Sequence, residues 1–248
     1  TKQLKKLVTP FILRRNKKEV LKELPDKIEQ NMILPFSDEE EKIYVANLAK
    51  VNEELQQLYD IEGSDKMQIL KMLTRLRQLC LEPRLVYDNI DQPSSKLKAC
   101  MELIKTMQEN KQKVLLFSSF TSALDLIAEE CQKAGITYYM LTGSTNKEER
   151  RELVSRFQKD DTTLFLISLK AGGTGLNLTS AENVIHYDPW WNVSAQNQAT
   201  DRAYRIGQKS NVQVFNLVMK DSVEEKIIEM QKRKKELADM FVENNSGG

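Results

Sequence analysis

Two arginines toward the C-terminal end of the chain have a spacing that suits phosphate chemistry. Arg202 and Arg205 lie in the segment QATDRAYRIGQ (198–208). Residues three and four apart share one helix face, so Gln198 and the two arginines can project together across an interface. Gly207 is well placed to end such a helix. Two guanidinium groups held in this way can stabilise a phosphate whose negative charge grows during a reaction. By itself, the same spacing more often marks solvated arginines on a surface helix.

A glycine-rich loop precedes the arginines and has the composition of an anion-binding site. It reads AGGTG (171–175) and is followed closely by Asn177. Glycines let a backbone approach a phosphate, and their amides can form a concave anion nest. Most isolated glycine-rich loops are only tight turns, so this loop gains its meaning from the segments around it.

Two further loops carry hydroxyl groups directly after predicted strands. The hydroxyl groups belong to Ser118, Ser119 and Thr142, and Gly143 follows the last of these. Exposed amides and hydroxyls at a helix N-terminus bind phosphate well. Simple helix capping explains each loop individually, because Ser and Thr are common N-cap residues. Together with the loop that contains Ser168 and Lys170, they predict a row of phosphate contacts along one edge.

The hydrophobic pattern supplies a scaffold that brings these segments together. Short apolar runs alternate with amphipathic helices between residues 94 and 221. Strands are predicted at 114–117, 136–141, 163–168, 183–187 and 212–218, and helices at 96–109, 122–134, 146–159 and 194–205. Such alternation produces an α/β fold, a parallel sheet with helices on both faces. Ligands of such sheets bind beyond the carboxyl ends of the strands, where every candidate segment lies.

A helical hairpin is predicted before the sheet. Apolar residues recur at helical spacing in 37–60 and 69–80, and a Gly-Ser pair at 63–64 separates the two stripes. Ser37 and Glu40 form a capping box at the start of the first helix. We therefore divide the chain into a basic lead-in segment (1–36), a helical protrusion (37–93), the sheet domain (94–221) and a C-terminal helix with its tail (222–248).

The composition argues against several classes of protein. The 248 residues are 40% apolar with a net charge of +1, and no apolar run approaches the ~20 residues of a membrane span. Cys80, Cys100 and Cys131 lack metal-ligand spacing and are expected to be core thiols in a reducing compartment. Because His186 is the single histidine, we expect no histidine-based metal site. The net charge does not demand nucleic acid, so any nucleic-acid binding must be argued from the motifs.

Taken in order, these pieces resemble the Swi/Snf family of ATP-dependent DNA translocases within helicase superfamily 2. The matching segments are TPFILRRNKKEVLKELPDK (9–27), LTRLRQLCLEPRL (73–85), KVLLFSSF (113–120), YYMLTGST (138–145), SLKAGGTGLNLTSA (168–181), DPWWN (188–192) and QATDRAYRIGQ (198–208). The resemblance covers nearly the whole chain, and the ordered set is highly specific although no single segment is. One departure is Val193, where the family commonly has proline.

The resemblance implies a RecA-like second motor lobe and assigns roles to individual residues. The implied DNA contacts are Ser118, Ser119, Thr142, Gly143, Ser168, Lys170, Gly172, Trp191 and Asn192. The residues implied to lie toward the nucleotide are Gly173, Gly175 and Asn177. Arg202 and Arg205, with Gln198 beside them, would face the γ-phosphate as arginine fingers.

Two motifs of the family are absent from this sequence. It contains no G-x-x-x-x-G-K-[ST] phosphate loop and no Asp-Glu-x-His magnesium motif, and the family carries both on its first motor lobe. We therefore expect a fragment, the second lobe of a larger protein, that is inactive alone. ATP and Mg²⁺ would be held mainly by the missing first lobe.

The same expectation names partners and a location. The partners are double-stranded DNA, the first motor lobe of the same protein and, as a further candidate, a DNA-bound protein complex, with no membrane involved. The protein is expected to be intracellular, in the nucleus of a eukaryote or in the cytoplasm and nucleoid of a bacterium.

Two other functions remain open from the sequence. One is a lobe of an RNA helicase or strand-separating helicase of the same superfamily. The other is a nonenzymatic nucleic-acid-binding or protein-binding domain in which the motor has decayed. The intact arginine pair argues against decay, and the helical protrusion favours a DNA translocase over a simpler helicase.

Overall fold

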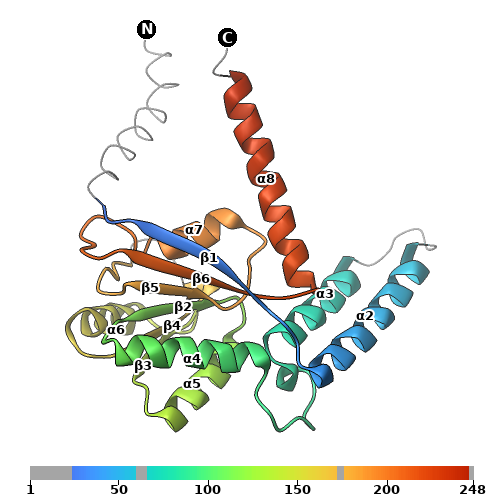
Figure 1. The fold of residues 1–248 in the computed structure, drawn as a ribbon, viewed down its shortest axis with the longest axis horizontal. Coiled ribbons are helices and arrows are strands. Elements are labelled where there is room, and N and C mark those ends of the chain that lie inside the picture. Colours follow the sequence, from blue (N-terminus) through green and yellow to red (C-terminus); the bar gives the residue numbers. More distant parts are fainter. Residues whose placement is uncertain (1–23, 60–65, 172–175, 246–248) are drawn as a thin grey trace.

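A six-stranded, fully parallel sheet forms the centre of the molecule (Figure 1). The computed structural model describes residues 24–59, 66–171 and 176–245. The strands are β1 (Lys27–Leu34), β2 (Val114–Ser118), β3 (Tyr138–Leu141), β4 (Leu164–Ser168), β5 (Asn183–His186) and β6 (Val212–Met219). Their spatial order is β1-β6-β5-β2-β4-β3. The α/β, RecA-like sheet predicted from the alternating pattern is therefore confirmed.

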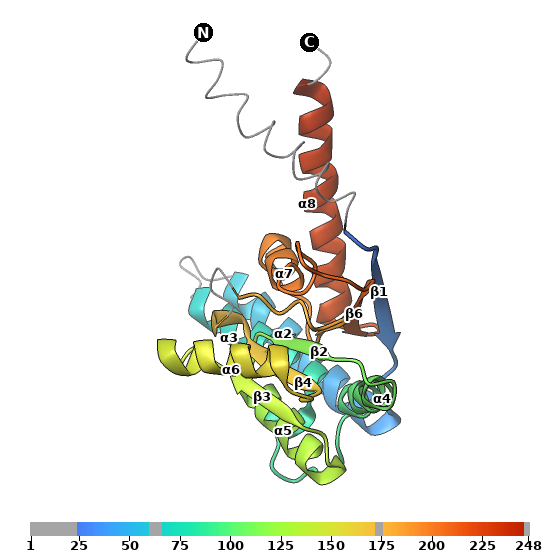
Figure 2. The same cartoon turned by 90° about the vertical axis from the view of Figure 1, so that its left-hand side faces the viewer.

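Helices cover both faces of the sheet, as the pattern predicts. The α-helices of the described residues are α2 (Asp38–Tyr59), α3 (Lys66–Leu81), α4 (Ser95–Glu109), α5 (Thr121–Ala134), α6 (Lys147–Lys159), α7 (Val193–Thr200) and α8 (Val223–Asn245). The apolar faces of α4 and α5 pack with Leu116 and Leu166 on one side, whereas α6 and α7 pack with Phe165 on the other (Figure 2). Strands β2, β4 and β5 are buried along their whole length, which explains their continuous apolar runs. No helix of the described segments is long and apolar enough to cross a bilayer.

Strand β1 was not predicted. Its residues fall in the segment 1–36, which the sequence analysis treated as a basic lead-in. The strand pairs with β6 from Lys27 opposite Val212 to Leu34 opposite Met219. Because β1 lies at the edge of the sheet, most of its side chains are exposed and no apolar run marks it. The sheet therefore begins before the helical hairpin rather than after it.

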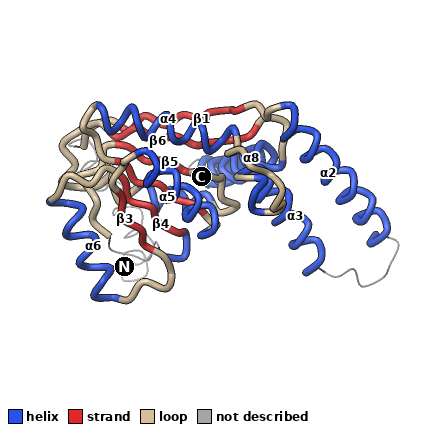
Figure 3. Tube along the Cα trace, turned by 90° about the horizontal axis from the view of Figure 1, so that it is seen from below, coloured by secondary structure: helices blue, strands red, loops and turns tan. Residues whose placement is uncertain are grey.

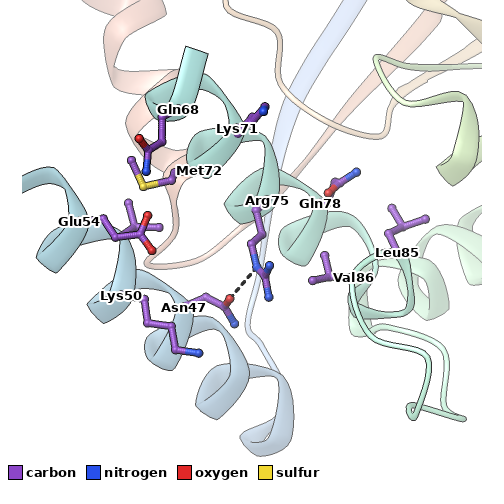
Figure 4. Close-up of a pocket in the computed structure, with 11 residues that line it drawn as sticks. Asn47, Lys50, Glu54, Gln68, Lys71, Met72, Arg75, Gln78, Leu85 and Val86 are labelled. Atoms are coloured by element: carbon purple, nitrogen blue, oxygen red, sulfur yellow. Dashed lines mark hydrogen bonds between the residues drawn. The ribbon is translucent and has the colours of Figure 1, made fainter. Parts of the chain in front are cut away.

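The helical hairpin predicted from two apolar stripes is formed by α2 and α3, which project away from the sheet (Figure 3). The capping box is present, because the Ser37 and Glu40 side chains each accept a hydrogen bond from the backbone N–H of the other residue at 3.3 Å. The Arg75 Nε donates to the Asn47 Oδ1 over 2.9 Å and joins the two helices across a pocket of about 600 Å³ (Figure 4). The two helices are thus fixed to each other by polar as well as apolar contacts.

A buried ion pair fastens α4 and α8 to the sheet. The Lys96 Nζ lies 2.7 Å from the Glu224 Oε1 and also donates to the backbone oxygens of Tyr187 and Leu217. Lys96 is 0% exposed and Glu224 is 1% exposed. Burial raises the pKa of the Glu224 carboxyl, while the charge of Lys96 acts in the opposite direction. The pair anchors the base of α8, whose C-terminal part extends beyond the sheet (Figure 1).

Candidate functional site

The loops after β2, β3 and β4 meet at the carboxyl edge of the sheet. Ser118 and Ser168 lie opposite each other at the ends of β2 and β4, and β3 ends alongside β4. A Cβ atom placed on Gly143 would lie 3.8 Å from the Cβ of Lys170, so the β3 and β4 loops are in contact distance. We call the loop residues 119–120, 142–146 and 169–171 the carboxyl edge. The structure brings together the three loops that the sequence analysis put in one row.

Asp188 supports the first of these loops from below. The carboxylate is 1% exposed, and its Oδ1 accepts hydrogen bonds from the Ser118 Oγ at 2.6 Å and from the Ser119 N–H at 3.1 Å. Ser119 also donates its hydroxyl to the Asp188 Oδ2. The side chain of Ser118, which is predicted to contact DNA, is fully buried and bonded to Asp188. Ser118 holds the loop, and Ser119 is the partly exposed residue of the pair.

The β4 loop presents one buried hydroxyl and one exposed cation. Ser168 is 3% exposed, and its Oγ has no hydrogen-bond partner among the described residues. Lys170 is exposed two residues later, and Asn177 is exposed beyond the glycines. The predicted roles of Gly172, Gly173 and Gly175 lie outside the residues that the structure describes. At the β3 loop, Thr142 is half-buried and Gly143 exposed, which leaves the backbone accessible.

The arginine segment is a series of turns rather than the continuation of a helix. Helix α7 ends at Thr200, so the helix predicted over 194–205 is five residues too long. The backbone oxygen of Arg202 accepts a hydrogen bond from the Leu178 N–H at 3.0 Å, and the oxygen of Ala203 accepts one from the Gln208 Nε2. These tertiary bonds occupy carbonyl groups that a longer helix would use. The arginines therefore converge through turns, and Gln198, Arg202 and Arg205 do not share a helix face.

The two arginines differ in exposure but lie within electrostatic reach of each other. Arg202 is 8% exposed, whereas Arg205 is exposed and donates from its Nη1 to the Leu176 backbone oxygen over 3.2 Å. Burial lowers the pKa of Arg202, the neighbouring Arg205 and Arg150 lower it further, and Asp201 raises it. An anion bound here would relieve the repulsion between these cations. Gln198 is exposed on α7.

The two tryptophans after β5 have different positions. Trp190 is 3% exposed and packs edge-to-face against Phe117 and His186, which makes it a core residue. Trp191 is 39% exposed, as required of a side chain that could meet a ligand. The Asn192 side chain caps α7 by accepting a hydrogen bond from the Ser194 N–H at 3.0 Å. Asn192 thus has a structural contact in addition to its predicted position near DNA.

Two family descriptions match the sequence in succession. Residues 1–85 match the family described as SNF2-related domain, and residues 95–207 match the helicase conserved C-terminal domain. A solved structure described as the Sulfolobus solfataricus SWI2/SNF2 ATPase C-terminal domain superposes with a TM-score of 0.70 at 28% identity. The match covers 85% of this chain and 87% of that one. The chain belongs to the Swi/Snf family.

Further similarities extend the family assignment. The Sulfolobus solfataricus SWI2/SNF2 ATPase core in complex with dsDNA has a TM-score of 0.73 and 34% identity, over 86% of this Swi/Snf chain and 45% of that chain. A Mycoplasma pneumoniae protein named "Uncharacterized ATP-dependent helicase" is 39% identical over 92% of this chain and 22% of its own length. The chain spans about a quarter of the length of the curated relatives that it matches.

Three residues of this Swi/Snf lobe contribute to the site in ways that the sequence analysis missed. Asp188 and Arg77 hold the β2 loop, and the Gln208 side chain bonds the backbone at Ala181 and Ala203 to fix the arginine turn. Each lies in a quoted motif, so the motifs marked the right segments. Their partners are distant in sequence, and only the fold could reveal them.

Proposed function

We propose that this chain is the second motor lobe of an ATP-dependent translocase on double-stranded DNA. In this proposal Arg202 and Arg205 act as arginine fingers on a nucleotide held by a first motor lobe, and the carboxyl edge follows the DNA backbone. The observation that supports the proposal most directly is the hydrogen bond from Arg205 to the backbone of Leu176. This bond joins the arginine turn to the segment after the glycine-rich loop. The arginine turn therefore lies beside the chain that follows the glycine-rich loop.

The described residues fit the terminal phosphates of ATP but not a whole nucleotide. Two neighbouring guanidinium groups supply a planar, multidentate donor set for phosphate oxygens. Their mutual repulsion favours an anion between them, while the sequence has no phosphate loop to hold the rest of the nucleotide. Bound ATP with Mg²⁺ supplies the phosphoryl group and the free energy of its transfer. The arginines of this chain would stabilise the negative charge that grows on that group.

The carboxyl edge fits a nucleic-acid backbone because it offers donors without a base-reading element. Lys170 and the backbone at Gly143 can each contact a phosphate oxygen. Contacts of this kind carry no sequence information, which suits a motor that moves along arbitrary DNA. The similar Sulfolobus core is described as a complex with dsDNA. We therefore propose duplex DNA as the track, with a DNA-bound protein complex as the cargo and the nucleus or nucleoid as the location.

A comparison of nucleic acids tests this function against its alternative, a lobe of an RNA or strand-separating helicase. ATP hydrolysis by the full-length parent protein would be measured with duplex DNA, single-stranded DNA and RNA. The proposal predicts the strongest stimulation by duplex DNA, with no strand separation in a displacement assay. Strongest stimulation by RNA or single strands would contradict it. The isolated 248-residue chain is the control and should hydrolyse no ATP. Absence of any ATPase activity in the parent would favour a decayed motor that only binds.

A further inference from the structure

Arg77 reaches from the helical hairpin to the carboxyl edge of the sheet. It lies on α3, yet its Nη2 donates to the Ser119 Oγ over 3.0 Å and lies 3.4 Å from the Asp188 Oδ2. Its guanidinium also stacks over the Phe120 ring at 5.0 Å. The Arg77 side chain is only 14% exposed. One side chain of the protrusion thus contacts two consecutive residues of the β2 loop and the carboxylate that supports it.

The charge balance at this point matters for an anionic ligand. Asp188 holds a buried negative charge directly beneath the loop that we propose faces DNA phosphates. An unpaired carboxylate there would repel a phosphate and carry a large desolvation cost. The ion pair with Arg77 neutralises the carboxylate and leaves it free to order the loop by hydrogen bonds.

The part of α3 that carries Arg77 is itself bonded to its surroundings. Arg75, two residues earlier on α3, is bonded to Asn47 of α2 at 2.9 Å (Figure 4), and it also donates to the Tyr87 Oη at 3.3 Å. The stacked α2–α3 pair therefore presents Arg77 from a fixed platform. A shift of the hairpin relative to the sheet would pull directly on the β2 loop.

We propose that Arg77 is a positioning residue that couples the helical hairpin to DNA binding. It holds Ser119 and Phe120 by direct contact and neutralises Asp188, so that the β2 loop keeps the arrangement that meets the DNA backbone, and it does not touch the phosphate itself. The inference rests on the proposed function, because it assumes that the carboxyl edge binds duplex DNA. Through Arg77, a change in the position of the hairpin would alter the affinity of the lobe for duplex DNA.

Salt dependence separates a positioning residue from a phosphate contact. A cation that neutralises a phosphate releases counterions, and each such contact contributes ~0.9 to the slope of log affinity against log salt on duplex DNA. The charge of Arg77 is already neutralised by Asp188. Removing Arg77 should therefore weaken DNA binding without changing the slope of log affinity against log salt. Lys170 is exposed at the same edge and serves as the matched phosphate-contact variant.

The test uses the full-length parent protein and a duplex DNA of fixed length over a salt series. We expect Arg77→Ala to weaken duplex binding about tenfold at each salt concentration with an unchanged slope, whereas Lys170→Ala should lower the slope by ~0.9. The DNA concentration for half-maximal ATPase stimulation should rise by the same factor in Arg77→Ala, with the maximal rate retained. A lower salt slope in Arg77→Ala would mean direct phosphate contact and would overturn the inference.

A second variant distinguishes a specific loss of DNA binding from unfolding of the protein. Arg77→Ala leaves Asp188 buried without its cation, so Arg77→Ala/Asp188→Asn removes the charge while keeping an oxygen that can accept from Ser118. This double variant should unfold thermally like the wild type and still bind DNA weakly. Wild-type affinity in the folded double variant would overturn the role of Arg77 and leave the proposed function intact. Failure of the wild-type parent to bind duplex DNA would overturn both.

Discussion

The guanidinium of Arg205 donates a hydrogen bond to the backbone oxygen of Leu176 over 3.2 Å. A second bond, from the Leu178 N–H to the Arg202 backbone oxygen at 3.0 Å, runs in the opposite direction between the same two segments. The arginine turn and the chain that leaves the glycine-rich loop are therefore joined twice.

Replacing Gly207 should disturb the arginine turn. Gly207 has a φ of +101°, which L-residues adopt at a cost, so Gly207→Ala should lower stability by about 1 kcal/mol. It should also reduce the DNA-stimulated ATPase activity of the parent protein, because it displaces Arg205. Gly135→Ala is the matched control, with a φ of +67° at the end of α5 and no contact to the arginines. It should lose similar stability and keep its activity. Equal loss of activity in both variants would contradict the prediction.

The buried pair of Lys96 and Glu224 should dominate the attachment of α8. Lys96→Met leaves a carboxylate buried without its cation and should cost about 3–5 kcal/mol in the free energy of unfolding, measured with urea. Lys96→Met/Glu224→Gln should recover most of this loss, because it removes the charge and keeps an acceptor for the Met219 N–H. The pair of Lys133 and Glu130, whose side chains are 67% and 20% exposed, is the control, and Lys133→Met should change stability by less than about 1 kcal/mol. Similar costs for Lys96→Met and Lys133→Met would be inconsistent with a buried anchor.

His186 should make the protein less stable in mild acid. It is buried against Phe117, and burial lowers its pKa to about 3 from an ordinary value of 6.5. The unfolded chain binds a proton below pH 6.5 while the folded chain does not until about pH 3, so stability falls as the pH drops through this range. At pH 5 the loss from this residue is about 2 kcal/mol.

The measurement is the free energy of unfolding of wild type and His186→Gln at pH 7 and pH 5. Carboxyl groups titrate equally in both proteins, so the difference between the two proteins isolates the histidine. We expect the variant to gain about 2 kcal/mol relative to the wild type on going to pH 5. A constant difference at the two pH values would show that His186 is not responsible.

Much of the scaffold could be predicted from the sequence because its signals are local. The apolar runs of β2, β4 and β5 reflect burial on both faces, and the capping box at Ser37 marks the start of α2. Strand β1 could not be found in this way, since an edge strand with exposed side chains lacks an apolar run. Its pairing with β6 depends on residues more than 180 positions away.

The sequence predicted which segments form the site, but not how their side chains are arranged in space. The arginine spacing predicted a shared helix face, but bonds from Leu178 and Gln208 end the helix at Thr200 and form turns instead. Arg77 gave no local signal, because its partner Asp188 is 111 residues away. Spacing predicts a contact only while the secondary structure continues, and tertiary hydrogen bonds decide where it stops.

The role of Arg205 as an arginine finger is decided by the DNA-stimulated ATPase activity of the full-length parent protein carrying Arg205→Ala. We expect the turnover rate to fall ~10³-fold or more, because the growing charge on the transferred phosphoryl group is no longer stabilised by this guanidinium, while duplex DNA binding is retained. Arg156→Ala, which removes an exposed arginine of α6, is the control and should behave like the wild type. Normal hydrolysis by Arg205→Ala together with lost DNA binding would contradict the account.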